Sequence, residues 1–259
     1  MEPDVREVRV WRISEGSAGG VDDVVAREFP LTIFLNDTEL VTLLCSPTEL
    51  KSLAVGFLQS EGLVTAATDV KSVLVDETRG VVRVKTESGT GRMDEVFRRF
   101  ISSGCGRGAT FYSAADAAGM SKIESPVRVS SGEVMSLFKE FQQRSELYRN
   151  TGGVHSAALC NSREIIAFAE DIGRHNAIDK VFGRCLLDGV STDGLFVLTS
   201  GRISSEIVLK AARRMVPVLA SKSAPTDLGV KLAVDLGITL LGFVRGKRMN
   251  VYANEWRVN

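Results

Sequence analysis

The chain has 259 residues, of which 44% are hydrophobic and 25% charged, and these globular fractions argue against disorder, a coiled coil or a fibre. Lysine plus arginine and aspartate plus glutamate both number 32, so the composition supports neither general nucleic-acid binding nor membrane-surface binding. No apolar run reaches the roughly 18 residues of a membrane span, no secretory signal follows Met1, and the four cysteines lie far apart, so we expect a soluble cytoplasmic protein with free thiols.

The first part of the chain predicts a small α+β domain. Apolar residues alternate as in strands at 8–10 and again at 31–35. The segment 46–49, Ser-Pro-Thr-Glu, reads as a capping box with proline at the first helical position, so we expect a helix to begin there. Residues 70–75 and 81–84 flank a polar turn and predict a hairpin.

Beyond this part, helices and strands alternate regularly. We expect a helix over 132–148 and then a strand pair at 156–160 and 165–169. Three helix–strand steps follow, at 174–187 with 195–199, at 204–215 with 218–220, and at 225–236 with 238–243. Helices of this length between short apolar strands imply crossover connections and a three-layer, mixed but largely parallel sheet. Polar sequence from Tyr112 to Pro126 suggests the link, so we divide the chain into domains at 1–120 and 121–259.

Cations and small residues follow the predicted strands where each strand ends. Ligands gather at the carboxyl ends of strands in such sheets, and Ser200-Gly201-Arg202 and Ser221-Lys222-Ser223 stand there. After the last strand come Phe243, Val244, Arg245, Gly246, Lys247 and Arg248, in which three cations surround a glycine. We expect Arg202, Lys222, Ser223 and this last segment to bind a phosphate-bearing ligand, although a charge run can also be a solvated turn.

Cys105 is the predicted centre of the chemistry. It lies in Gly104-Cys105-Gly106-Arg107-Gly108, where the glycines favour a mobile loop that closes the first domain. The nearby Arg107 favours the thiolate and so lowers the pKa of the thiol. The alternative is an exposed cysteine of no consequence. Cys185 lies on an apolar helical face and Cys160 ends an apolar strand, so neither is expected to react.

The chain contains two histidines. His155 precedes a predicted strand in Thr-Gly-Gly-Val-His-Ser, and His175 opens a predicted helix in a stretch, 170–180, that is rich in acid, base and amide groups. That stretch could be a solvated helix N-terminus, but its density of polar types favours a site. We therefore include His155 and His175 among the candidate binding residues.

Five strings are similar, in order and spacing, to successive motifs of the FdhD family of formate dehydrogenase accessory sulfurtransferases. They are SPTELKSLAVGFLQSEG, TGGVHSAAL, EDIGRHNAIDKVFG, LTSGRISSEIVLKAA and GFVRGKRMNVY. The resemblance covers about Phe29 to Tyr252. It implies a C-terminal fold similar to cytidine deaminases, a homodimer, and residues 243–248 as the segment that binds the bis-guanine-dinucleotide form of the molybdenum cofactor.

The resemblance also implies an activity. A cysteine desulfurase would supply sulfur as a persulfide on Cys105, and the sulfur would pass to the molybdenum cofactor before insertion into formate dehydrogenase. Members of the family often carry two loop cysteines spaced C-x-x-C, but Gly108 occupies the second position here. Release of sulfur by an intraloop disulfide is therefore excluded.

Three other functions remain open. A zinc deaminase uses an H-x-E stretch and a P-C-x-x-C pair, and this chain lacks both, so we expect no zinc site. A Cys/His hydrolase would combine Cys105, His155 or His175, and Asp171, but a mobile loop suits a preorganised nucleophile poorly. A chaperone that binds the cofactor without moving sulfur is the third.

Overall fold

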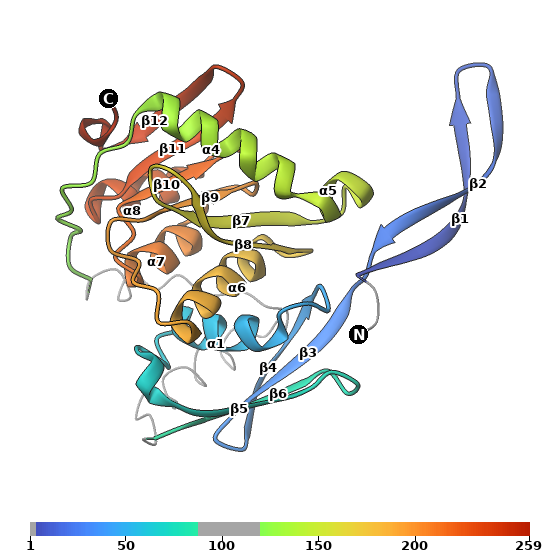
Figure 1. The fold of residues 1–259 in the computed structure, drawn as a ribbon, viewed down its shortest axis with the longest axis horizontal. Helices are drawn as coiled ribbons and strands as arrows, with labels where there is room; N and C mark the ends of the chain where they lie inside the picture. The colour runs from blue at the N-terminus through green and yellow to red at the C-terminus, as the bar shows by residue number, and fades with distance from the viewer. Residues whose placement is uncertain (1–3, 88–119) are drawn as a thin grey trace.

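The computed structural model describes residues 4–87 and 120–259. The predicted cysteine loop, 102–108, lies outside these residues, as does the sequence beside the predicted boundary at residue 120, so the division into two domains stays a prediction. Within the described residues, a six-stranded sheet with helices on both faces forms the larger part, and a four-stranded sheet and a projecting hairpin form the rest (Figure 1).

The six-stranded sheet is mixed. Its strands are β7 (His155–Cys160), β8 (Ile165–Asp171), β9 (Phe196–Thr199), β10 (Val218–Ser221), β11 (Thr239–Arg245) and β12 (Arg248–Ala253). They lie in the order β12-β11-β10-β9-β7-β8. Only the three central strands β9, β10 and β11 are parallel, and the other three pairings of this sheet are antiparallel. The expectation of a mixed sheet is confirmed, but "largely parallel" is wrong, because β7–β8 and β11–β12 are tight hairpins that need no crossover.

Helices cover both faces of this sheet, which gives the three layers expected. One face carries α4 (Ser131–Arg144), and α6 (Arg174–Leu187), α7 (Ser205–Arg213) and α8 (Asp227–Asp235) pack on the other (Figure 1). Successive strand residues point to opposite faces of the sheet and so belong to two separate apolar cores. Leu198 contributes to the core under α4, and Val197 to the core under α6 and α7. Every residue of β9 and β10 is buried, as expected of strands covered on both faces.

The N-terminal part is built around a second sheet. Its strands are β3 (Phe29–Leu35), β4 (Thr38–Cys45), β5 (Val70–Asp76) and β6 (Val81–Thr86), in the order β4-β3-β6-β5, and a short 3₁₀ turn, Ala67–Asp69, precedes β5. The predicted hairpin β5–β6 is confirmed. Helix α1 (Leu50–Ser60) packs on this sheet through a core that includes Leu31, Ile33 and Leu53.

Helices α1 and α6 join the two parts at very short range. A Cβ atom added to Gly56 of α1 would lie 1.8 Å from the carbonyl oxygen of Asp179, and one added to Gly183 of α6 would lie 1.9 Å from that of Ser52. Only glycine permits this approach at both positions. Leu186 of α6 belongs to the core of the N-terminal part, so the two parts share apolar packing.

The hairpin of β1 (Val5–Ser14) and β2 (Ser17–Ala26) projects from the body as a two-stranded arm (Figure 1). Trp11 and Ile13 are 70% and 78% exposed on it. The sequence indicated a strand around Val8 and Val10, but the partner strand and the projection were not predicted, because glycines and aspartates in 17–26 weaken its strand pattern.

Two predicted helices differ from those in the structure. Helix α1 begins at Leu50, and the capping box at 46–49 is wrong: Glu49 is in the left-handed region with φ of 54° and provides no side-chain cap. Ser46 is instead buried and bound to Asp171 and Ile172. The predicted helix over 132–148 breaks at Ser145 into α4 and α5 (Glu146–Thr151).

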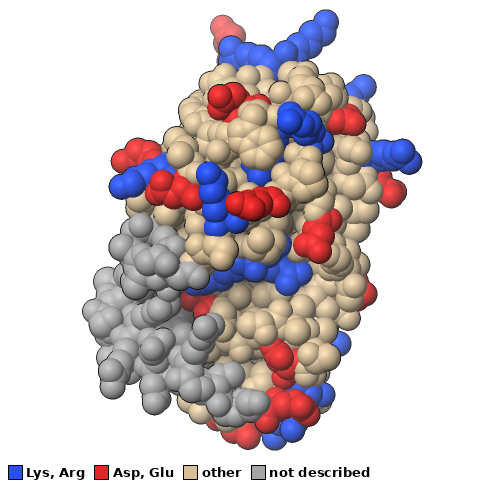
Figure 2. All heavy atoms as spheres, turned by 90° about the vertical axis from the view of Figure 1, so that its left-hand side faces the viewer, with Lys and Arg blue, Asp and Glu red and all other residues tan. Residues whose placement is uncertain are grey.

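On the face drawn in Figure 2, basic and acidic side chains are both present and are scattered among uncharged residues. This agrees with the balanced composition. Within the described residues, none of the helices has the length and apolar character needed to span a bilayer.

Candidate functional site

The carboxyl ends of β9 and β10 and the amino end of β7 meet at one edge of the six-stranded sheet. Thr199 pairs with Ser221 on one side and with Ala157 on the other. Because β7 runs antiparallel to β9, its first residue, His155, lies at the edge where β9 and β10 end. The structure therefore brings together His155 and Lys222, which the sequence proposed from separate motifs.

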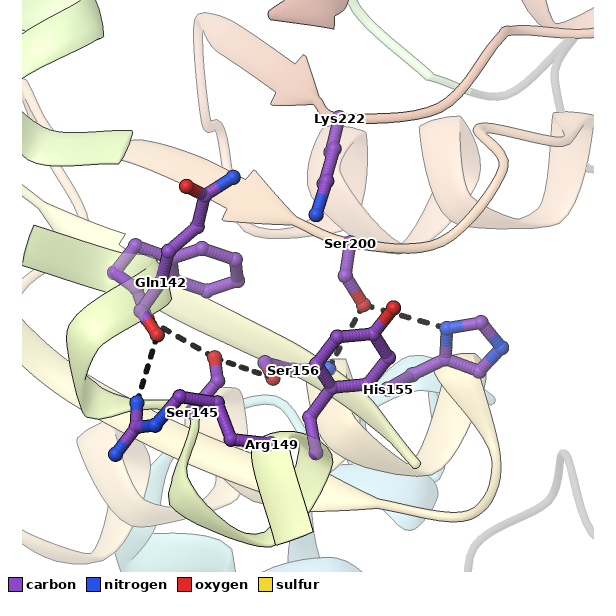
Figure 3. A pocket seen from close by; sticks show the side chains of 9 residues that line it. Gln142, Ser145, Arg149, His155, Ser156, Ser200 and Lys222 are labelled. Carbon is purple, nitrogen blue, oxygen red and sulfur yellow. Dashed lines mark hydrogen bonds between the residues drawn. The ribbon is translucent and has the colours of Figure 1, made fainter. Parts of the chain in front are cut away.

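A cavity of about 290 Å³ opens at this edge, between the sheet and the junction of α4 with α5 (Figure 3). Its lining combines aromatic rings, hydroxyls and cations from Phe141, Gln142, Ser145, Tyr148, Arg149, His155, Ser156, Ser200 and Lys222. Such a mixture of apolar walls and a few polar groups is typical of small-molecule sites. Two of the predicted binding residues, His155 and Lys222, line it.

Hydroxyl groups form the floor of the cavity. The oxygens of Ser145 and Ser156 lie 2.9 Å apart, and the Ser156 amide donates to Ser200 Oγ at 2.9 Å. Nδ1 of His155 lies 3.3 Å from the same Ser200 oxygen. This chain of contacts couples the α4–α5 junction to the strand ends.

The break at Ser145 shapes the wall of the cavity. Ser145 donates its hydroxyl to the Phe141 carbonyl at 3.0 Å, and the Glu170 carboxylate of β8 accepts from the Leu147 and Tyr148 amides, each at 3.0 Å. A carboxylate at these free amides supports a new helix start. Burial raises the pKa of Glu170, and the amide bonds oppose this effect. The result is that Tyr148 faces the site.

Cations border the cavity on the side of β10 and β11. Figure 3 shows Lys222 extending from the end of β10 toward the cavity, and its Nζ lies 5.7 Å from the centre of the Tyr148 ring. Arg245 donates Nε to the Lys222 carbonyl at 3.1 Å, and the Phe243 amide donates to the Ser223 carbonyl at 3.0 Å. The predicted binding segments after β10 and at the end of β11 are therefore in direct contact.

The segment 243–248 comprises the end of β11, the turn at residues 246 and 247, and the first residue of β12. Gly246 has φ of 56°, which the turn requires, and Arg245 pairs with Arg248 across it. Phe243 also has positive φ, 51°, at an irregularity of β11, and an aromatic residue seldom adopts this conformation. Val244 points into the core at 2% exposure, whereas Lys247 and Arg248 are exposed. The side chain of Val244 is thus unavailable to a ligand.

His175 lies outside the lining of the cavity. Its Nε2 is 3.2 Å from a carboxylate oxygen of Glu206 on α7. Burial, assisted by the charges of Lys210 and Arg174, lowers the pKa of His175 to about 3, so the ring is neutral at physiological pH. The structure thus separates the two histidines: His155 faces Ser200 and His175 faces Glu206.

The three cysteines among the described residues are buried. Burial raises the pKa of all three, and that of Cys45 rises to about 12. Cys45 also donates its thiol to the Phe29 carbonyl at 3.4 Å. None of these three thiols is therefore poised to react at neutral pH. The fourth cysteine, Cys105, lies outside the described residues.

The contacts of Asp171 bear on the hydrolase alternative. Its carboxylate binds the Ser46 and Gly173 amides, the Asn176 side chain and, at 2.7 Å, Lys180 Nζ. Both histidines have other partners. Asp171 thus anchors the start of α6 to the β4–α1 corner, and the geometry does not favour a triad in which it orients a histidine.

Most of the aromatic and hydroxyl wall of the cavity was not predicted from the sequence. Phe141, Ser145 and Tyr148 follow one another at spacings of four and three, which place them on one face of a helical segment. This spacing indicates that the three side chains share one side of a helix. It does not indicate a binding site, because the sheet edge that they face is known only from the tertiary structure.

Three comparisons bear on this arrangement. The sequence model of the FdhD/NarQ family matches residues 26–259. The chain is 42% identical over 260 residues to the sulfur carrier protein FdhD of Bacillus subtilis (strain 168), covering 100% of this chain and 99% of that protein. It is also 42% identical to the protein of the same name from Listeria innocua, with 98% of each chain covered. A crystal structure of a putative formate dehydrogenase accessory protein from Desulfotalea psychrophila superposes with a TM-score of 0.83 at 28% identity, covering 99% of this chain and 100% of that one.

Proposed function

Since the chain belongs to the FdhD/NarQ family, we propose that it is a sulfur carrier for the maturation of formate dehydrogenase, with Cys105 as the carrying residue. The observation that carries this proposal is the burial of Cys45, Cys160 and Cys185, whose raised pKa values leave Cys105 as the reactive thiol. The partners we propose are a cysteine desulfurase, formate dehydrogenase and a second copy of this chain.

Loading of sulfur follows the chemistry of thiol–disulfide exchange. The Cys105 thiolate attacks the outer sulfur of a persulfide on the desulfurase. A new S–S bond forms on Cys105, the S–S bond of the donor breaks, and the donor cysteine leaves as a thiolate. No net oxidation occurs in this step, so it needs no further reactant.

Delivery of the sulfur as sulfide needs two electrons. A second thiol that attacks the inner sulfur of the Cys105 persulfide would expel hydrosulfide toward the metal and leave a disulfide on Cys105. Gly108 cannot supply that thiol, and the other three cysteines are buried. We therefore propose that an external thiol reductant completes the cycle.

The cargo we propose is the bis-guanine-dinucleotide form of the molybdenum cofactor, bound at the edge described above. Arg202, Arg245, Lys247 and Arg248 are exposed there, and their positive charges suit the phosphates. Lys222 and the aromatic wall suit a planar ring beside them. The chemistry of these groups thus fits an anionic dinucleotide.

Mass spectrometry after incubation with a cysteine desulfurase and cysteine tests the carrier role. We expect one added sulfur atom, located on the peptide that contains Cys105, and its removal by a thiol reductant. Sulfur found on Cys160 or Cys185, or on no cysteine, would contradict the proposal.

A thermal melt tests the binding edge. GDP mimics one arm of the cargo, and at a concentration of a hundred times Kd it should stabilise the protein by about 2.7 kcal/mol. The double variant Arg245→Glu, Arg248→Glu should lose most of this shift. Its ligand-free stability should change by less than about 1 kcal/mol, because exposed charges contribute little.

Arg79→Glu, Arg163→Glu is the matched control, since both arginines are exposed and lie in other turns. It should keep the full shift with GDP. An equal shift in the wild type and in the Arg245, Arg248 variant would place the phosphates elsewhere, and the β11–β12 turn would then be a solvated surface turn.

A further inference from the structure

The contacts of Ser200 bear on the protonation of His155. The Ser200 hydroxyl oxygen accepts from the Ser156 amide at 2.9 Å and lies 3.3 Å from Nδ1 of His155. Figure 3 shows the other ring nitrogen of His155 directed away from Ser200 and from the cavity. Nδ1 of the imidazole is thus engaged by Ser200, whereas Nε2 points away from the cavity and has no hydrogen-bond partner among the described residues.

The hydroxyl of Ser200 has a single proton to donate. Within residues 4–87 and 120–259, the acceptor in hydrogen-bond range of that proton is Nδ1 of His155. If Nδ1 carried a proton itself, the half-buried hydroxyl of Ser200 would lose this acceptor. The arrangement that satisfies both groups leaves Nδ1 bare and puts the ring proton on Nε2.

The surroundings of His155 favour the neutral ring. Burial lowers its pKa, the guanidinium charges of Arg174 and Arg202 lower it further, and Asp171 opposes them. Arg174 also lies tight against the strand end, since a Cβ atom on Gly201 would lie 2.7 Å from Arg174 Cβ. Its Nε is buried without a hydrogen-bond partner among the described residues. A neutral N–H donor therefore lies in the field of two permanent cations.

We infer that Ser200 is a positioning residue that fixes His155 as the tautomer protonated on Nε2, and that this N–H donates to a phosphate group of the bound ligand in the field of Arg174 and Arg202. Phosphate is the chemical class indicated, because it pairs with arginine and accepts hydrogen bonds from neutral donors. The ligand part of this inference rests on the proposed function, whereas the tautomer part does not.

Nitrogen NMR tests the tautomer in the ligand-free protein. The chain has only two histidines, so long-range ¹H–¹⁵N spectra of the wild type and of His175→Gln assign both rings. At pH 7 we expect His155 to be neutral and protonated on Nε2. Ser200→Thr keeps a hydroxyl and should keep this signature, whereas Ser200→Ala should give a mixture of tautomers. Protonation on Nδ1, or a charged ring at pH 7 in the wild type, overturns the inference.

Titration with GDP tests the donor role. The Nε2 proton of His155 should shift on binding, and His155→Ala should raise the Kd for GDP about tenfold, as expected for loss of a hydrogen bond to a charged acceptor. His155→Gln, which retains an N–H donor, should recover part of the affinity. If GDP stabilises the protein but neither moves the Nε2 proton nor depends on His155, this inference fails while the proposed function stands. If GDP does not bind at all, the donor role falls together with the proposed binding edge.

Discussion

Replacement of Cys105 with serine is expected to abolish the maturation of formate dehydrogenase. A serine hydroxyl is not ionised at neutral pH and cannot hold a persulfide, so no sulfur can be loaded. The three buried cysteines cannot substitute, because their thiols are inaccessible and have raised pKa values. The measurement is formate dehydrogenase activity in a strain whose only copy of this gene carries Cys105→Ser.

The same variant separates a carrier from a chaperone. Cys105→Ser should still be stabilised by GDP to the wild-type extent, because none of the described residues that line the cavity is a cysteine. Cys185→Ala is the control: it removes a core thiol from α6, should reduce stability modestly, and should leave maturation intact. Normal maturation with Cys105→Ser would favour the non-catalytic chaperone.

Replacement of Lys210 with methionine is expected to destabilise the protein by about 3–5 kcal/mol, which is typical when one partner of a buried ion pair is removed. Lys210 Nζ lies 2.5 and 2.7 Å from the two Asp179 oxygens, and the two side chains are 2% and 1% exposed. Ser60 of α1 donates to the same carboxylate at 2.5 Å. Burial raises the pKa of Asp179, and Lys210 is the main opposing charge. Without it, this junction of α1, α6 and α7 contains an uncompensated acid.

Urea unfolding of the wild type and three variants measures this effect. Arg144→Met removes the cation of an exposed pair with Glu140, in which the side chains are 45% and 39% exposed, and should cost less than about 1 kcal/mol. The double variant Asp179→Leu, Lys210→Met should be more stable than Lys210→Met alone, because no buried charge remains unpaired. Equal losses in the free energy of unfolding for Lys210→Met and Arg144→Met would show that the buried pair contributes no more to stability than the exposed pair.

The local sequence pattern was sufficient to predict a helix or strand where the segment has one strong hydrophobic periodicity. Helix α6 begins and ends where the apolar spacing indicated, and the hairpins β5–β6 and β7–β8 occur at the predicted positions. These elements could be predicted because their burial follows a repeat of 3.6 or 2 residues that the sequence itself displays. The placement of the segments after β10 and at the end of β11 at one edge of the sheet followed from the same reasoning, since parallel strands end at one edge.

Contacts with residues distant in the sequence decided where α1 begins and where the helix predicted over 132–148 breaks. Ser46 and Glu49 have the composition of a helix cap, yet Asp171, 125 positions away from Ser46, binds the Ser46 amide, and α1 starts later. The helix predicted to Tyr148 breaks at Ser145 because Glu170 of β8 caps the second half. A local cap contributes about 1 kcal/mol, which a buried tertiary hydrogen bond to a charged group can match or exceed.

The sequence by itself determined the family motifs, the existence of most helices and strands, and the choice of Cys105, because these depend on residue type and short-range spacing. Only the tertiary structure decided that His155 faces Ser200 while His175 pairs with Glu206, and that Tyr148 and Lys222 border one cavity. The direction of β7 and the break at Ser145 produce that arrangement. Both result from contacts between segments far apart in the chain, where the energy of burying polar groups outweighs local preference.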